Sequence, residues 1–168
     1  VIEASSYQLD YSKLFKSNIS AILNISPDHL ERHKTLSKYI KAKFKLIKSQ
    51  TKKDFAILNT NNFHINEQLK EKNFLPKIIR VDGKVDLSIL KKINNSYFMT
   101  KGNKENLSFI LEIAKIFKIK KKNLIEILKK FKGLKYRQQI IFKSKYLTII
   151  NDSKATSFSS SASVLESM

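Results

Sequence analysis

The chain has 168 residues, which suits one domain, or one domain with part of another. Its apolar content of 42% can build a core, and no apolar stretch approaches the length of a membrane span. The absence of cysteine excludes disulfides and thiolate metal sites, and it fits a reducing cytosol. The first residues predict a strand that runs into a loop, and not a signal peptide.

The formal net charge of +19 raises nucleic acid as a partner. Lysine carries nearly all of this charge, because the only arginines are Arg32, Arg80 and Arg137, and the lysines are scattered along the chain. Nucleic-acid-binding proteins rely on arginine for bidentate contacts and usually cluster their charge. We therefore predict a solvated basic surface that favours anionic substrates, with no nucleic-acid partner. A basic nucleic-acid-binding module stays as the alternative from a different class.

Strands alternate with helices in the first half of the chain. Short apolar runs that end at turn residues predict strands, and apolar residues at spacings of three and four predict helices. Strands are predicted at residues 1–3 (a strand end), 19–25, 55–59 and 78–81, a loop at residues 4–9, and helices at residues 36–48 and 64–71. This alternation predicts an α/β fold with a doubly wound, mostly parallel sheet.

The second half begins with a weaker pattern. A candidate edge strand, two amphipathic helices and two strands are predicted, in that order, at residues 97–99, 107–117, 124–131, 139–142 and 146–150. Gly133 follows the second helix, where glycine commonly ends helices. We therefore predict a domain boundary there, with residues 1–132 in one domain and residues 133–168 at the beginning of the next.

Two features of the first half could carry chemistry. Ser26-Pro27-Asp28 ends the strand at residues 19–25, so Asp28 and His29 lie just beyond its carboxyl end, where open α/β sheets bind their ligands. Lys43 falls on the apolar face of the helix that follows. Its stem could simply lie along apolar surface, as lysines commonly do. Alternatively its amine is drawn inward, where a neutral amine can react with an electrophile such as carbon dioxide.

Other polar residues have ordinary structural interpretations on spacing alone. Glu3 is interpreted as a solvated charge, Asn103 as a helix cap, and Asp152 or Ser153 as the cap of a strand-to-helix turn. A lone histidine such as His29 is more often structural than catalytic, and His33 is predicted to lie on the surface.

Together, however, these segments resemble the central domain of the Mur ligases and the opening of the C-terminal domain that follows it. The strongest match is Leu23-Asn-Ile-Ser-Pro-Asp-His-Leu-Glu-Arg-His33 with Tyr39 and Lys43, and the second is Asp-Ser-Lys-Ala-Thr at residues 152–156. Three weaker matches lie at residues 3–9, 102–106 and 133–137. The chain departs from the family pattern at Tyr7, Gly102, Lys135, Tyr136 and Ser157.

The resemblance implies roles for these residues. It implies that Lys43 is carbamylated by carbon dioxide, and that Glu3, His29 and Lys43 surround two magnesium ions. It implies that Lys43, His29 and Arg137 are catalytic. It assigns contacts with ATP to Asn103, Asn106, Arg137, Asp152 and Lys154. It places on the substrate side Ser5, Gln8, Lys154 and Thr156.

The activity implied by the resemblance is ATP-dependent amide formation in peptidoglycan precursor synthesis. The form of residues 3–9 and of Arg32-His33 favours the cytoplasmic members that add D-glutamate to UDP-N-acetylmuramoyl-L-alanine through an acyl phosphate. Another Mur-type or folylpolyglutamate-type ligase is the nearest alternative. The sequence has no phosphate-binding glycine loop, which the family carries before the position of Glu3. We therefore expect this chain to be a fragment, inactive alone, of a protein that acts as a monomer and completes a Rossmann-like domain after residue 133.

Overall fold

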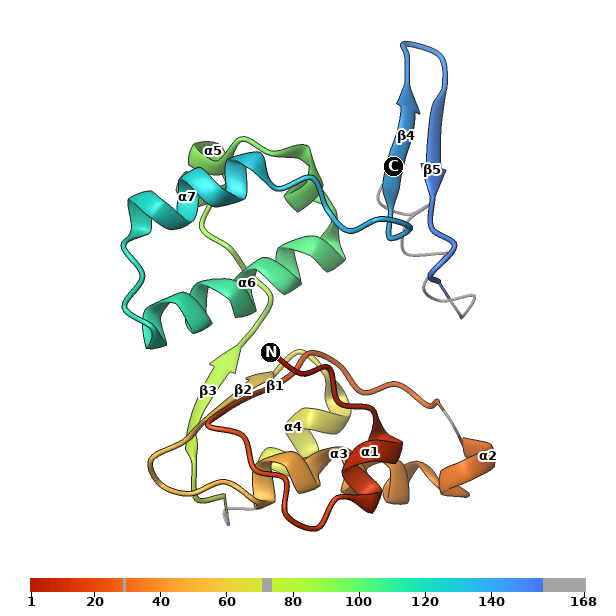
Figure 1. Cartoon of the computed structure of the whole chain (residues 1–168), viewed down its shortest axis with the longest axis vertical. Coiled ribbons are helices and arrows are strands. Elements are labelled where there is room, and N and C mark those ends of the chain that lie inside the picture. The colour runs from red at the N-terminus through yellow and green to blue at the C-terminus, as the bar shows by residue number, and fades with distance from the viewer. Residues whose placement is uncertain (29, 71–73, 156–168) are drawn as a thin grey trace. The chain divides into compact units, whose positions relative to one another are not determined.

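The computed structural model describes residues 1–28, 30–70 and 74–155. The chain forms two compact units, Val1–Gly83 and Lys84–Met168 (Figure 1). Within the described residues, no helix combines the length and the apolar character needed to cross a membrane.

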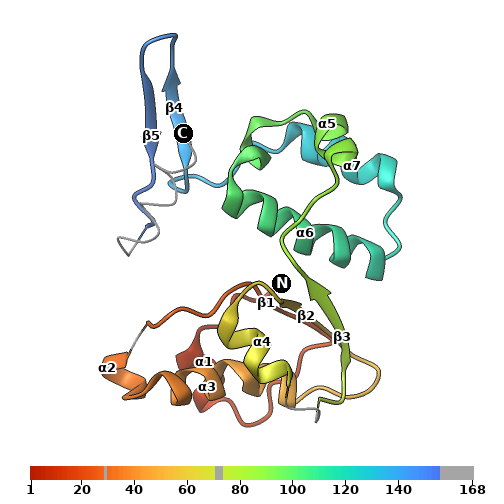
Figure 2. The same ribbon diagram turned by 180° about the vertical axis from the view of Figure 1, so that it is seen from behind.

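The first unit contains a three-stranded parallel sheet. Its strands are β1 (Ile19–Ile22), β2 (Phe55–Asn59) and β3 (Lys77–Val81), in that spatial order. Two helices, α3 (Leu36–Lys48) and α4 (Phe63–Leu69), form the crossovers. Both crossovers run in the same direction along the sheet, so right-handed connections place both helices on one face (Figures 1 and 2). The predicted parallel α/β arrangement is confirmed for these strands.

The core of this unit lies between the sheet and these two helices. Phe44 and Ile47 of α3 are fully buried, and Ile65 of α4 is fully buried on the same side. Leu58 of β2 projects into the same cluster. The helix predicted at residues 36–48 matches α3, because its apolar residues recur at the spacing of one helix face. Thr35 caps it, since its hydroxyl accepts a hydrogen bond from Lys38 N.

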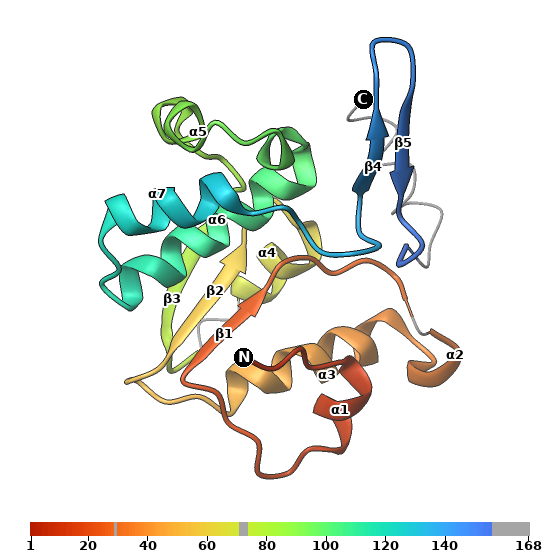
Figure 3. The ribbon, with the colours of Figure 1, turned by 45° about the horizontal axis from the view of Figure 1, so that its top comes forward.

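The segment before β1 was predicted wrongly. Residues 1–3 form no strand, and the predicted loop contains a helix, α1 (Ser6–Tyr11). The reason is a capping box: Gln8 N donates to Ser5 Oγ at 3.2 Å, and Ser5 N donates to Gln8 Oε1 at 2.8 Å. Figure 3 shows α1 against α3, with the short helix α2 (Leu30–His33) at the N-terminal end of α3.

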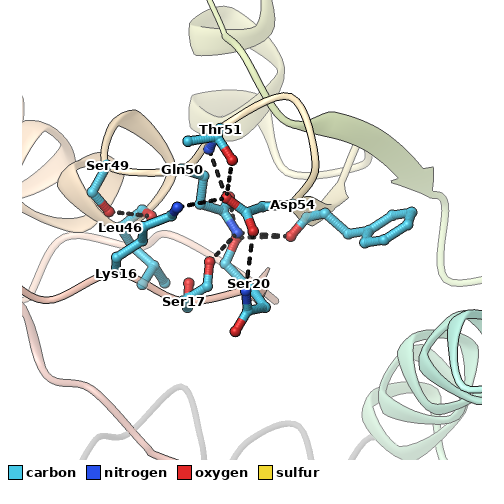
Figure 4. Close-up of polar contacts among 10 residues, drawn as sticks. Lys16, Ser17, Ser20, Leu46, Ser49, Gln50, Thr51 and Asp54 are labelled. Carbon is cyan, nitrogen blue, oxygen red and sulfur yellow. Dashed lines mark hydrogen bonds and ion pairs between the residues drawn. The ribbon is translucent and has the colours of Figure 1, made fainter.

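A buried polar network joins the amino ends of β1 and β2 (Figure 4). Asp54 is only 3% exposed and accepts hydrogen bonds from Thr51 N and Thr51 Oγ1, both at 2.7 Å, and from Asn18 Nδ2 at 3.2 Å. Beside it, Gln50 Nε2 donates to Phe55 O at 2.9 Å. These bonds lower the pKa of Asp54 to about 2, because they stabilise its charged form.

We expect Asp54 to make this unit sensitive to acid. A folded-state pKa below the ordinary value of 3.8 means that the carboxylate adds stability above that pH, and that this contribution is lost as the pH falls through about 2. Asp54→Asn should therefore lower the urea midpoint at pH 6, and the difference from wild type should vanish near pH 2. Asp10→Asn, which removes an exposed ion pair with Lys45, should change the midpoint little. A difference for Asp54→Asn that stays constant from pH 6 to pH 2 would contradict the assignment.

The second unit consists of helices followed by a β-hairpin. In chain order it contains α5 (Leu87–Ile93), the 3₁₀-helix η1 (Ser96–Met99), α6 (Lys101–Ile116), α7 (Lys121–Lys130) and the antiparallel strands β4 (Gln139–Lys143) and β5 (Thr148–Asn151). The two predicted amphipathic helices and the two predicted strands are confirmed. The fold-class prediction thus holds for a parallel α/β sheet, to which the structure adds this small antiparallel pair.

Two predictions for this unit were wrong. Residues 97–99 lie in η1 and form no edge strand, because Asn95 Oδ1 accepts from Tyr97 N and starts a helical turn. Asn103 does not cap α6: Thr100 does, and Asn103 lies inside the first turn of the helix. The helix α5, which was not predicted, buries Leu90 and Ile93.

Candidate functional site

Asparagine side chains organise the carboxyl edge of the parallel sheet. Asn59 Nδ2 donates to Leu23 O at 2.9 Å, and Asn62 Nδ2 donates to Ile25 O at 3.0 Å. Both amides therefore hold the segment that leaves β1 and leads to Asp28. The sequence predicts Asn59 as the end of a strand and Asn62 as part of the turn that follows, because nothing in their spacing reveals a partner more than 30 residues away.

Lys43 lies half-buried on α3, with its Nζ 5.3 Å from the centroid of the Tyr39 ring. Burial lowers the pKa of Lys43, and the negative charge of Asp28 opposes that shift. Burial also raises the pKa of Tyr39, and the charge of Asp28 adds to that rise. The charge of Asp28, which lies beyond the end of β1, therefore acts on the side chains of both Tyr39 and Lys43. The Lys43 amine lies over the ring of Tyr39 on its own helix, within electrostatic range of the Asp28 carboxylate.

The predicted substrate-side residues of the first unit lie around the start of α1. Glu3 is exposed and stands three residues before the helix. Ser5 and Gln8 are exposed as well, and they bond to each other in the capping box. The structure places the segment of Glu3 at the entrance to α1, and α1 packs against the helix that carries Lys43.

His33, predicted to lie on the surface, is buried and only 5% exposed. Its Nε2 is hydrogen-bonded to Ser6 Oγ at 2.9 Å. Its ring contacts the rings of Tyr7 and Tyr39, at centroid distances of 5.6 and 5.5 Å. The prediction failed because α2 is too short for its periodicity to reveal a buried side.

Two predicted site residues, His29 and Thr156, lie outside the described residues. Among the residues that are described, no group of three or more His, Cys, Asp or Glu side chains gathers as a metal site. The structure brings Asp28 within electrostatic range of Lys43. A magnesium ion in this unit would therefore need further oxygen ligands, from a modified Lys43 or from bound phosphates.

In the second unit, hydrogen bonds of backbone groups bring together the segments of three residues predicted to bind ATP. Arg137 lies in a turn between Tyr136 and Gln138, whose φ angles of 65° and 48° are left-handed. Gln138 N donates to Asp152 Oδ1 at 3.0 Å, and Lys154 N donates to Tyr136 O at 3.1 Å. The turn that carries Arg137 is therefore joined to the segment of Asp152 and Lys154, and the charged groups of Arg137 and Lys154 are exposed.

Tyr97 ties this turn to the helices of the same unit. Gly133 has a φ of 78°, and a Cβ there would lie 2.7 Å from the Tyr97 ring, so glycine is needed for both conformation and space. Burial raises the pKa of Tyr97, and the positive charge of Arg137 opposes the rise. The carbonyl of Tyr97 accepts from Asn103 Nδ2 at 2.8 Å. Asn103 is therefore hydrogen-bonded to Tyr97, and the charge of Arg137 acts on the Tyr97 side chain.

A pocket of about 990 Å³ lies between the start of α6, the end of α7 and the hairpin. Its lining includes Asn103, Phe131, Gln138 and Ile150, which combine apolar surface with amide groups. Asn103 is buried, whereas Asn106, one turn along α6, is exposed. A mixed apolar and amide lining suits a planar heterocycle that offers hydrogen-bonding edges.

Comparison with known families defines the class of protein. The Mur ligase middle domain family matches residues 1–124, which is most of the chain and includes the asparagine edge and Lys43. The chain therefore belongs to the Mur ligase family, as the sequence resemblance predicted.

Individual relatives point further. The chain is 37% identical over 176 residues to the UDP-N-acetylmuramoylalanine–D-glutamate ligase of Pseudothermotoga lettingae, an alignment that covers 99% of this chain and 39% of the relative. Ligases of the same name from Natranaerobius thermophilus and Clostridioides difficile are each 32% identical, with 99% of this chain covered and 40% and 41% of the relatives. The chain thus spans about two fifths of the length of these relatives.

Proposed function

We propose that this chain is part of an ATP-dependent ligase that joins D-glutamate to the carboxylate of UDP-N-acetylmuramoyl-L-alanine in the cytoplasm. The observation that carries the proposal is the half-buried Lys43 amine beside Asp28 and Tyr39, at the edge of the sheet where α/β proteins bind ligands. The family match and the names of the relatives support the substrates.

The reaction divides into two transfers. The γ-phosphoryl group of ATP passes to the substrate carboxylate and forms an acyl phosphate with release of ADP. The amine of D-glutamate then attacks the acyl carbon, the C–O bond to phosphate breaks, and inorganic phosphate and a proton leave. Such catalysis consists mainly of positioning and of neutralising charge on the phosphoryl oxygens.

In the first unit, Lys43 would become an anion. Its neutral amine adds to carbon dioxide, an N–C bond forms and a proton leaves, which yields a carbamate. The lowered pKa of Lys43 supports this step, because more of the amine is neutral. Magnesium, when bound, would neutralise phosphate charge. Glu3, His29 and the Lys43 carbamate would hold two such ions, while Ser5 and Gln8 would face the nucleotide-sugar substrate.

In the second unit, residues around Tyr97 would bind ATP. Asn103 and Asn106 would contact the adenine, and Arg137 would contact the γ-phosphate with its planar, permanently charged guanidinium group. Asp152 would contact the nucleotide and Lys154 the phosphates, with Thr156 on the substrate side. We further propose that residues 133–168 begin a Rossmann-like C-terminal domain, that the central domain is doubly wound, and that the full-length enzyme is a monomer.

The proposal is tested in the full-length protein that contains this chain. We expect release of ADP and phosphate that requires both UDP-N-acetylmuramoyl-L-alanine and D-glutamate, together with magnesium. Release that instead requires lysine or diaminopimelate with a longer peptide substrate, or glutamate with a folate, would favour the related ligases. Steeply salt-dependent binding of DNA or RNA without nucleotide hydrolysis would favour the nucleic-acid-binding module.

A further inference from the structure

Three separate sequence segments of the first unit meet around one buried imidazole. His33 ends α2, Ser6 and Tyr7 begin α1, and Tyr39 lies in the first turns of α3. Ser6 is 2% exposed and His33 is 5% exposed, so the 2.9 Å hydrogen bond between them is shielded from water. A hydrogen bond in such surroundings is costly to lose, because each partner would be left buried without its bond.

The contact continues from His33 to Lys43. The His33 and Tyr39 rings lie 5.5 Å apart, within the range of favourable aromatic contacts, and the Lys43 amine lies 5.3 Å from the centre of the same Tyr39 ring. A chain of direct contacts thus leads from Ser6 through His33 and Tyr39 to Lys43. Ser6 in turn stands three residues after Glu3.

Helix α1 depends on such contacts for its position. A helix of six residues has little stability of its own. Other polar links from α1 to α2 and α3 join Tyr7 to Glu31, Arg32 to Tyr11 and Lys45 to Asp10, and they are exposed and therefore weak. The bond between Ser6 and His33 is, by contrast, a buried polar contact that holds α1 to these helices.

We propose that His33 is a positioning residue that fixes the Glu3 segment and α1 against the helix carrying Lys43. The consequence for catalysis rests on the proposed ligase function, because only there do Glu3 and Lys43 share bound ions. The contact itself does not depend on that function. His33 touches no substrate in this assignment and acts through Ser6 and Tyr39.

The contact is tested first by amide hydrogen exchange on the 168-residue chain. The amides of Leu9 and Ser12 report on α1, because they donate to Ser5 O at 3.0 Å and Gln8 O at 2.9 Å. We expect His33→Phe, which keeps a ring but removes the hydrogen bond, to speed their exchange at least tenfold, with the amides of β2 changed less than twofold. Ser6→Ala should do the same, and the double variant should add little. His64→Phe, in α4, is the matched control.

The catalytic consequence is tested in the full-length ligase. We expect His33→Phe and Ser6→Ala to raise the magnesium concentration for half-maximal rate about tenfold, while His64→Phe leaves it unchanged. A general loss of stability would not produce this shift at a temperature where all variants are folded.

The possible results distinguish a failure of the positioning role of His33 from a failure of the proposed ligase function. Unchanged exchange at Leu9 and Ser12 in both variants, or equal loss of protection in β2, overturns the positioning contact. Faster exchange in α1 with an unchanged magnesium requirement also overturns the positioning role and leaves His33 a structural residue. Faster exchange in α1 of a protein whose wild type has no ligase activity leaves the contact intact and rejects the proposed function.

Discussion

Lys43→Ala in the full-length protein is expected to lower the rate of amide formation about a thousandfold or more, while the protein stays folded. The alanine removes the amine proposed to carry the carbamate. The site then loses an anion proposed to hold magnesium, and magnesium is the group that would neutralise phosphate charge. The half-buried position of the amine beside Asp28 and over Tyr39 leaves room that a small anion can enter when the side chain is cut back. Acetate or formate should therefore restore part of the rate.

The control for this prediction is Lys41→Ala. Lys41 lies on the same helix and is exposed, so its loss should change the rate less than twofold and gain nothing from short carboxylates. Initial rates of phosphate release, measured with and without acetate at constant ionic strength, separate the two variants. Full activity of Lys43→Ala would remove the carbamate from the mechanism.

Phe44→Ala is expected to lower the free energy of unfolding of the first unit by about 3–5 kcal/mol. Phe44 is fully buried between α3 and the sheet, and its ring lies 5.8 Å from that of Phe74, so truncation opens a cavity that surrounding side chains can fill only partly. Domains are typically stable by about 5–15 kcal/mol, so this loss would leave the unit close to unfolding. Unfolding of the unit would also remove the contact between the amine of Lys43, the preceding residue, and the Tyr39 ring.

The matched control is Phe63→Ala on α4. Phe63 is 69% exposed, and its truncation should cost less than about 0.5 kcal/mol. The chain contains no tryptophan, so urea-induced unfolding is best followed by circular dichroism. Similar losses for both variants would show that the core does not lie where the structure places it.

Local interactions account for the correct sequence predictions. Periodicity placed Lys43 on the same helix face as Phe44 and Ile47, and short apolar runs located the three parallel strands, since both patterns reflect which side of an element is buried. Two of the errors also have local causes. Ser5 and Gln8 form a capping box that starts α1 where a loop is predicted, and Asn95 starts a helical turn where an edge strand is predicted.

The sequence by itself determined the family, the strands and crossover helices of the parallel sheet, and the face of α3 on which Lys43 lies. Only the tertiary structure decided which charge acts on the Lys43 amine, because Asp28 comes from the segment that Asn59 and Asn62 hold beyond β1. It likewise decided that His33 is buried, since the surface covering its ring belongs to α1 and α3. Side-chain spacing reports the burial of one element at a time, whereas these contacts arise only when elements distant in the chain pack together.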